Sequence, residues 1–392
     1  MKLTLVYPGC HPAGGVERVV WEAARHLSTT HEVRVITAKA TDLPPNVEVV
    51  LTGSEPRPGS FRRKASESLG PDPGLVVSFG TDCPPAHVLV MQSVHAAWVE
   101  RGAAVQVGPV PVPGWARRLL WRHQVRLHME REGLRAASGP IVVVSEGVRD
   151  DLRRLYGIPV ERMHVVPNGF DPAQCSPQRR MGLRTKRRQD LGLAEEEVVL
   201  LLVANEYHRK GLGVLLDAMA AVGDPRLRLL LVGRMAPISY ASRIRQLGLA
   251  NQVTYCGATD DVALFHAAAD LFVLPTQYEA FGSVIIEALA SGLPVIASKL
   301  AGAAGVILHG RNGLLLNDPL DSTELAGLLR QGLDPAARRE MSERAPNSVA
   351  GFEWSTVMSR LATVLEPAWA HLGAVSPLAH RDVASKKMRH PT

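Results

Sequence analysis

Two glutamates in an apolar setting offer the clearest chemistry in this sequence. Glu279 and Glu287 lie on either side of a Gly–Ser pair, and every residue from Val284 to Ala290 other than Glu287 is apolar. This pattern predicts a buried helix that carries one carboxylate, and an unpaired buried carboxylate is costly. Glu287 must therefore either pair with a structural arginine or face a site whose occupant donates hydrogen bonds to it. A ribose diol is such an occupant.

The start of the same helix is a candidate anion site. Glu279 ends the preceding strand, and the backbone N–H groups of Phe281, Gly282 and Ser283 point out of the helix N-terminus. Ser283 and Glu287 are four residues apart and share a helix face. A phosphate at the helix end and a sugar diol beside Glu287 could therefore belong to one nucleotide.

A pair of cations follows another strongly apolar strand. Arg209 and Lys210 lie between that strand and the next helix, in the segment VANEYHRKG. Such a pair is more often part of a solvated turn. Its strand-end position, which it shares with Glu279, favours the alternative that the two cations bind a diphosphate.

Two further candidates follow strands in the first half of the chain. Gly14 and Gly15 precede a helix, where a Gly pair lets the backbone approach a phosphate. The spacing is not Gly-x-Gly-x-x-Gly and no acid ends the second strand, EVRVITA, so a nicotinamide oxidoreductase is disfavoured. His95 also follows a strand. It is either structural or a hydrogen-bonding partner for sugar hydroxyls.

The elements that must position these residues alternate along the chain. Short apolar runs alternate with segments of helical period, which predicts parallel strands joined by crossover helices. The basic stretch 174–190 interrupts the alternation and is interpreted as the boundary between domains. The fold class is therefore α/β, with two doubly wound Rossmann-like domains facing across a cleft. Ligands of such sheets bind at the carboxyl ends of the strands.

We expect four segments. They are an acceptor-binding domain at 1–172, a nucleotide-sugar-binding domain at 173–352, a helix at 353–375 that packs back on the first domain, and a disordered tail at 376–392.

Composition excludes several classes of protein. Hydrophobic residues make up 46% of the 392 residues, and the four cysteines follow no metal-ligand or disulfide-scaffold pattern. The formal charge of +6 permits anionic partners, but aromatic residues are only 5% and do not interleave with basic ones, so nucleic acid is not an expected partner. No apolar run is long enough to span a membrane. We expect a cytoplasmic protein.

A basic segment runs from Trp115 to Arg135. It carries six arginines, with tryptophans and leucines at its start. One interpretation is a solvated helix face that Glu130 and Glu132 partly balance. The other is peripheral contact with the anionic inner face of a membrane.

Taken together, these motifs resemble those of the retaining family-4 glycosyltransferases of the GT-B fold. The resemblance extends over most of the chain and is carried by YPGCHPAGGVERV, VVSEGVRDDL, VVPNGFD, EAFGSVIIEALASGLPVIAS and HGRNGLLL. The pair of glutamates separated by seven residues is its most specific mark. The HRKG form of the basic pair is similar to that of lipopolysaccharide-core glucosyltransferase-like enzymes.

The resemblance implies transfer of a hexosyl unit, with retention, from a nucleotide-diphosphate sugar to an acceptor hydroxyl. The donor would be UDP- or GDP-linked, and the acceptor a glycan, a glycolipid or a small metabolite. Glu287 would hold the ribose, Glu279 would contact the donor sugar, and the amides of Phe281, Gly282 and Ser283 would meet sugar or phosphate.

The same resemblance assigns roles to the remaining candidates. Arg209 and Lys210 would neutralise the departing diphosphate, the Gly15 amide would touch its distal phosphate, and His95 would hold donor or acceptor hydroxyls. No cofactor or metal is then expected, because the cations and the helix dipole supply the positive charge. The sequence also shows no Asp-x-Asp in a strand-end loop.

Two alternatives remain open, and one departure stands out. A sugar-nucleotide epimerase or hydrolase would use the same two-domain plan but needs a second acid beside Glu279. A non-catalytic, membrane-peripheral binding protein would depend on the basic segment. Many relatives carry a Gly-Gly-x-x-Glu turn where this chain has LAGAAGVI at 300–307, without an acid.

Overall fold

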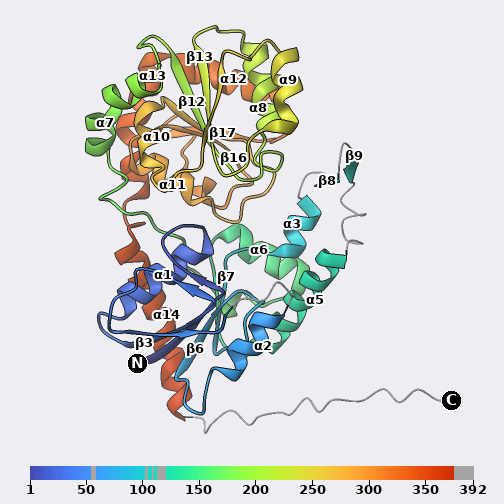
Figure 1. Cartoon of the computed structure of the whole chain (residues 1–392), viewed down its shortest axis with the longest axis vertical. Coiled ribbons are helices and arrows are strands. Elements are labelled where there is room, and N and C mark those ends of the chain that lie inside the picture. The colour runs from blue at the N-terminus through green and yellow to red at the C-terminus, as the bar shows by residue number, and fades with distance from the viewer. Residues whose placement is uncertain (54–58, 102–104, 108–109, 113–120, 375–392) are drawn as a thin grey trace, which may run out of the picture.

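The computed structural model describes residues 1–53, 59–101, 105–107, 110–112 and 121–374. These residues form two α/β domains, one above the other in Figure 1. All strand pairs of both central sheets are parallel. The predicted fold class, two doubly wound Rossmann-like domains, is confirmed.

The first sheet has the strand order β11-β10-β7-β6-β1-β3-β5. Its strands β6 and β7 are buried along their whole length, as expected where helices cover both faces of a parallel sheet. The strands are β1 (Lys2–Val6), β3 (Glu32–Thr37), β5 (Val47–Leu51), β6 (Leu75–Phe79), β7 (Val88–Met91), β10 (Ile141–Val143) and β11 (Met163–Val165). The helices are α1 (Val16–Leu27), α2 (Ser60–Glu67), α3 (His95–Arg101), α5 (Trp121–Ala136) and α6 (Glu146–Tyr156).

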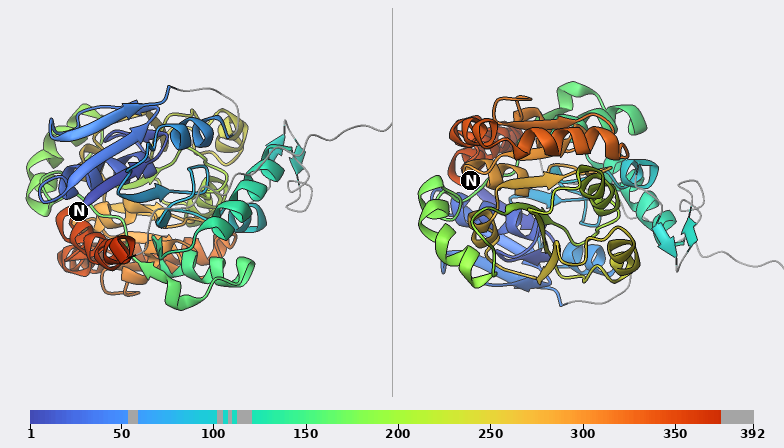
Figure 2. Two further views of the ribbon diagram at one scale, coloured as in Figure 1. Left: turned by 90° about the horizontal axis from the view of Figure 1, so that it is seen from below. Right: turned by 90° about the horizontal axis from the view of Figure 1, so that it is seen from above.

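Two small strand pairs accompany this sheet. β2 (Gly9–Cys10) pairs with β4 (Lys39–Ala40), and β8 (Val105–Val107) pairs with β9 (Val110–Val112). In both views of Figure 2 the teal segments, α5 with β8 and β9, lie at one side of the molecule.

The second sheet has the order β14-β13-β12-β15-β16-β17. Its strands are β12 (Val198–Val203), β13 (Leu227–Val232), β14 (Val253–Gly257), β15 (Leu271–Leu274), β16 (Val295–Ser298) and β17 (Gly313–Leu316). Its helices are α7 (Pro177–Asp190), α8 (Leu212–Val222), α9 (Ala241–Gln246), α10 (Ala263–Ala268), α11 (Ser283–Ala290), α12 (Ser322–Leu333) and α13 (Pro335–Arg344). The order reverses between β12 and β15, which is the switch point where such sheets bind ligands.

The carboxyl ends of the two sheets meet. Val94, which follows β7, is hydrogen-bonded to Tyr278, which follows β15. Ser145, which follows β10, donates a hydrogen bond to the carbonyl oxygen of Ala280. The loops that parallel sheets use for binding therefore face each other across the interface between the domains.

The chain crosses between the domains twice, and the two crossings are paired. The backbone N–H of Phe170 donates to the Phe352 oxygen at 3.0 Å, and the N–H of Trp354 donates to the Phe170 oxygen at 3.1 Å. After the second crossing, α14 (Trp354–Ala374) contacts α1 and β6 of the first domain (Figure 1). The side chains of Val357, Met358 and Leu361 are buried in the first domain's core.

The basic stretch interpreted as a domain boundary is a helix of the second domain. Ser176 caps α7, and the helix packs against α10. Arg180, Arg184 and Arg188 recur every fourth residue and donate hydrogen bonds to carbonyl oxygens at the C-terminal end of α10. The basic composition therefore reflects cations that bind the C-terminal end of a neighbouring helix.

Arg188 is the buried member of this set. Its exposed fraction is 6%, and its guanidinium contacts an Asp270 carboxylate oxygen at 3.2 Å. Asp270 in turn accepts a hydrogen bond from the backbone N–H of Val199 in β12. The pair therefore ties α7 to the central strand of the second sheet.

We predict that Arg188→Met lowers the free energy of unfolding of the second domain by about 3 kcal/mol, because it leaves buried acceptors without a donor. Urea denaturation measures the change. Lys186→Met, at an exposed position of the same helix, should change the stability little. Equal effects of the two variants would contradict a role for the buried contact.

Candidate active site

The centre of the interface holds a carboxylate between two cations. Glu279 forms an ion pair with Lys210, and its Oε2 atom lies 3.3 Å from the Nη1 atom of Arg209. Arg209 also contacts Glu206 through Nε at 2.9 Å. The structure thus brings together three of the residues that the sequence singled out, from the loops after β12 and β15.

Backbone packing explains how the two loops come so close. Gly211 follows the cation pair with φ +81°, and a Cβ atom there would lie 2.1 Å from the carbonyl oxygen of Pro275. The backbone oxygen of Arg209 accepts hydrogen bonds from Thr276 and Gln277. The glycine of HRKG is therefore required for the approach of the cations to Glu279.

The cations keep Glu279 ionised. Burial would raise the pKa of Glu279, but the nearby charges of Lys210 and Arg209 outweigh burial and lower it. The site therefore presents a fixed carboxylate together with two cations, which suits the binding of polar, anionic ligands.

The segment 300–307, which departs from the family pattern, supports the backbone of Glu279. In the 3₁₀ turn Gly302–Val306, the N–H of Gly302 donates to the backbone oxygen of Glu279 at 2.9 Å. The N–H of Ala303 donates to the backbone oxygen of Phe281 at 2.8 Å. A Cβ atom at Gly302 would lie 2.0 Å from the Ala280 oxygen. The sequence predicted that Glu279 ends the strand, but β15 ends at Leu274 and Glu279 lies in the loop that follows. Without an acid, this turn still positions that loop by backbone contacts.

The predicted helix start is present at α11. Gly282 is the N-cap residue with φ +92°, and no side chain caps the helix. The first-turn N–H groups therefore remain free of side-chain acceptors at the end of the helix that faces the first domain. Across the interface, the Asn168 side chain lies 3.4 Å from the Ser283 hydroxyl.

Glu287 lies one turn further along α11 and faces α1. Its Oε1 atom is 3.8 Å from Nη1 of Arg18, a loose pairing rather than a close hydrogen bond. Burial raises the pKa of Glu287, while Arg18 acts in the opposite direction. Arg18 also lies 3.7 Å from Glu22 and over the Trp354 ring.

The Gly14–Gly15 turn begins α1 in the same region. A Cβ atom at Gly14 would lie 2.6 Å from a Glu17 carboxylate oxygen, whereas no atom lies within 4 Å of a Cβ position at Gly15. Gly15 caps α1 without a side-chain hydrogen bond. The backbone at Gly15 is therefore open to a ligand, as the interpretation of this turn requires.

His95 begins α3 within a cluster of rings. It stacks on Trp98 and His123, and its Nε2 atom lies 3.2 Å from Nδ1 of His123. The buried carboxylate of Glu130 accepts hydrogen bonds from the backbone N–H groups of His95 and Ala96 at 2.6 and 3.0 Å. Glu130 therefore does not balance a solvated face of the basic segment, as the sequence had suggested, because it is 3% exposed and caps α3.

Sequence reasoning missed two residues of this site. Glu130 stood in a run of charged residues, and its apolar neighbours come from other elements. Arg18 could have been found, because it lies one helical turn after the Gly pair that already marked a phosphate site.

Of the basic segment 115–135, residues 115–120 lie outside the described part of the chain. In the remainder, Arg135 forms an exposed pair with Glu132 at 3.1 Å, and Trp121 is 71% exposed. No helix among the described residues combines the length and apolar character needed to cross a bilayer. The predicted tail also falls outside the described residues.

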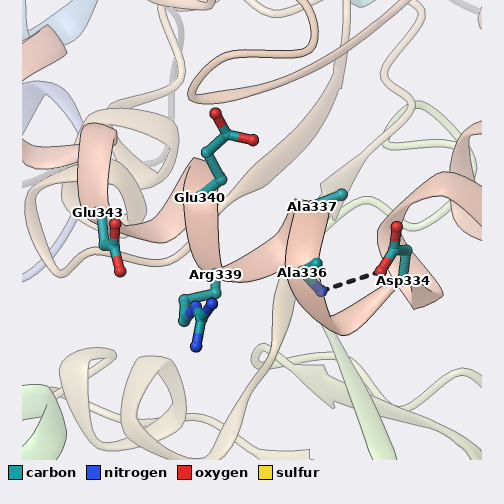
Figure 3. A pocket seen from close by; sticks show the side chains of 6 residues that line it. All are labelled: Asp334, Ala336, Ala337, Arg339, Glu340 and Glu343. Carbon is teal, nitrogen blue, oxygen red and sulfur yellow. Dashed lines mark hydrogen bonds between the residues drawn. The ribbon is translucent and has the colours of Figure 1, made fainter.

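A separate hollow of about 490 Å³ lies where α12 meets α13 (Figure 3). It is lined by Asp334, Ala336, Ala337, Arg339, Glu340 and Glu343. Asp334 is engaged in capping α13, and the side chains of Arg339, Glu340 and Glu343 point in different directions. Nothing in this hollow converges on a ligand.

Two family models match the chain in succession. The model of Glycosyltransferase Family 4 matches residues 13–174, and the model of Glycosyl transferases group 1 matches residues 184–348. The chain is a GT-B glycosyltransferase. The family and the enzyme class predicted from the motifs are confirmed.

Named relatives agree with this assignment. The glycosyltransferase is 28% identical to D-inositol 3-phosphate glycosyltransferase 2 of Catenulispora acidiphila, over 91% of each chain. It is 27% identical to the lipopolysaccharide glucosyltransferase WaaG of Escherichia coli K12, over 58% of this chain and 62% of WaaG.

Solved structures share the fold. The crystal structure of WaaG superposes with a TM-score of 0.77 at 23% identity, covering 92% of this glycosyltransferase and 99% of WaaG. The Anabaena protein HepE in complex with UDP-glucose superposes with a TM-score of 0.71 at 21% identity, covering 94% and 100% of the two chains.

The environment of His95 predicts an unusual titration. Burial, followed by the charges of Arg126 and His123, lowers the pKa of His95 to about 4. The unfolded chain therefore binds a proton at His95 below pH ~6.5 that the folded protein does not bind until pH ~4, so stability decreases as the pH falls through this window. NMR titration of the imidazole should give a midpoint near 4. A midpoint near 6.5 would contradict the burial of His95 in the ring cluster.

Proposed function

We propose that this glycosyltransferase moves a hexosyl unit, with retention and without a metal, from a nucleotide-diphosphate sugar to an acceptor hydroxyl. The observation that carries the proposal is the cluster of Lys210, Arg209 and Glu279 beside the uncapped start of α11, with Glu287 one helical turn away. The cations and the free amides lie where a diphosphate would bind, and the carboxylate of Glu287 follows them where the ribose of the same nucleotide would lie.

Donor binding would use the first two turns of α11 together with the basic pair. Arg209, Lys210 and the first-turn amides would bind the diphosphate, and Glu287 would accept hydrogen bonds from the ribose hydroxyls. The contact of Glu287 with Arg18 is loose, at 3.8 Å, so a hydroxyl donor could replace it at small cost. The amide of Gly15, which has open space beside it, would meet the distal phosphate from the first domain.

The chemical step would break the bond between the anomeric carbon and the diphosphate oxygen and form a bond from that carbon to the acceptor oxygen. Negative charge develops on the departing phosphate, where Lys210 and Arg209 stabilise it. The departing phosphate oxygen would take the proton of the incoming hydroxyl. Because leaving group and acceptor then share one face of the sugar, the configuration is retained.

Glu279 and His95 would orient the sugar between the domains. Glu279 is held ionised by two cations, so it can accept hydrogen bonds from sugar hydroxyls. His95 is neutral near pH 7, so its imidazole can donate or accept a hydrogen bond without carrying charge. The two cations and the helix N-terminus supply the charge that a divalent ion would otherwise provide.

The relatives support a choice of donor and acceptor to test. HepE, which shares this fold, binds UDP-glucose in its crystal structure, and this supports UDP-glucose as the first donor to test. Two relatives are named for inositol 3-phosphate and for lipopolysaccharide, so sugar phosphates and glycolipids are the acceptor classes to screen.

We predict that UDP, or failing that GDP, raises the melting temperature of the protein, whereas UMP raises it less. A ligand that binds only the folded state stabilises it in proportion to the logarithm of its concentration over Kd. A thermal-shift titration measures this effect. Equal shifts with UMP and UDP would speak against a diphosphate site.

We predict that Lys210→Met lowers kcat about 100-fold, because the variant lacks a cation that stabilises the negative charge developing on the phosphate.

Glu287→Gln should instead weaken UDP binding about tenfold, because a charged acceptor of ribose hydroxyls is lost. Activity assays with UDP-glucose and calorimetry with UDP measure the two effects. Lys186→Met and Glu343→Gln, both at exposed positions, serve as controls.

Normal folding with full activity in Lys210→Met would overturn the assignment of the basic pair. Product analysis with and without an acceptor distinguishes transfer from epimerisation or hydrolysis.

A further inference from the structure

Glu279 lies between two residues that are each hydrogen-bonded to the other domain. The hydroxyl of Tyr278 accepts from the backbone N–H of Val94 at 3.2 Å and donates to the Val94 oxygen at 3.3 Å. On the other side, the hydroxyl of Ser145 donates to the Ala280 oxygen at 2.6 Å. The carboxylate is thus fastened to the first domain immediately before and immediately after its own position.

Tyr278 is well suited to make a lasting contact. The residue is 4% exposed and belongs to an apolar cluster that includes Val94 and Val143 of the first domain. Its backbone oxygen accepts hydrogen bonds from Arg209 and from the Thr276 hydroxyl, which fixes the peptide that carries the ring. Burial raises its pKa, so the hydroxyl keeps the proton that it donates.

The partner of Tyr278 is the residue immediately before His95. The Val94 oxygen also accepts the N–H of Trp98, so Val94 belongs to the first turn of α3. A single hydroxyl therefore bonds the residue beside Glu279 to the residue beside His95. The relative placement of the two sugar-facing side chains depends on this contact.

Ser145 makes its contact in a way that the sequence pattern conceals. Its oxygen accepts from the Val148 N–H and so caps α6, while its proton goes to Ala280. Gly302 keeps space for it, because a Cβ atom at Gly302 would lie 2.8 Å from the Ser145 hydroxyl oxygen. Ser145 therefore caps α6 and contacts the second domain through the same hydroxyl.

We infer that Tyr278 is a positioning residue that aligns Glu279 with His95 across the domain interface, with Ser145 as a second contact on the same segment. The inference rests on the proposed function of Glu279 and His95. Arg209, Lys210 and Glu287 all belong to the second domain, and the Gly15 amide is the one proposed nucleotide contact from the first domain. Nucleotide affinity therefore depends on this alignment much less than turnover does. Turnover requires it, because the sugar must meet both domains at once.

The contact itself is tested by amide hydrogen exchange in the full-length protein. In Tyr278→Phe, the Val94 amide loses its acceptor and should exchange at least about fivefold faster than in the wild type. The matched control is Tyr255→Phe, which loses a hydroxyl hydrogen bond of 2.9 Å to the Gly233 oxygen within the second domain. Unchanged exchange at Val94 in Tyr278→Phe would overturn the inference.

The consequence is tested by kinetics with UDP-glucose and binding of UDP. In Tyr278→Phe, kcat should fall about five- to tenfold while the Kd for UDP stays within about twofold. Ser145→Ala should show the same split. Ser176→Ala removes the N-cap of α7 without an interdomain bond, so it controls for the loss of a cap. An unchanged kcat, or a Kd that rises as much as kcat falls, would overturn the inference.

These results separate the inference from the proposed function. If the wild-type protein neither binds UDP nor turns over UDP-glucose, the choice of donor fails, and the kinetics are repeated with the nucleotide sugar that raises the melting temperature. Val94 exchange is independent of any donor and then decides whether Tyr278 joins the domains.

Discussion

The site depends on one electrostatic constraint, the half-buried carboxylate of Glu279 held against two cations at the interface. Such a group is costly to bury unless its partners come close, and the close approach of the loops after β12 and β15 provides them. Gly211 makes that approach possible, and the 3₁₀ turn Gly302–Val306 supports the loop at Glu279 through backbone hydrogen bonds. These glycine-containing turns therefore hold the cations and the acid close enough for Glu279 to stay ionised.

The parallel α/β class of both domains was predictable from the alternation of apolar runs with helical segments. Strands β12 and β13 are almost entirely buried, and α6 begins after the side-chain cap at Ser145, so these elements leave clear patterns in the sequence. The helix α7 was not predicted, because its arginines follow no apolar period. The partners of these arginines are carbonyl oxygens at the end of α10, more than 70 residues further along the chain.

The part of the candidate site that lies at the carboxyl edge of the second sheet was predictable. Arg209, Lys210 and Glu279 lie in the loops that follow β12 and β15, and Gly282 precedes α11, so topology brings all four to one edge of the sheet. Arg18 could have been proposed from its place one helical turn after the Gly pair, but the contacts of Glu130 were not predictable, because they depend on which face of a helix meets another element. Hydrogen bonds of Tyr278 and Ser145 across the interface likewise require the relative placement of two domains, which no local pattern contains.

The paired crossings at Phe170 and Trp354 have a mechanical consequence. Two strands of chain that lie side by side and share backbone hydrogen bonds resist torsion more than a single connection would. They still allow bending about a line perpendicular to them. Separation of the domains would then be a rotation about one dominant axis. The loops at the edge of the interface farthest from the two crossings would move the most.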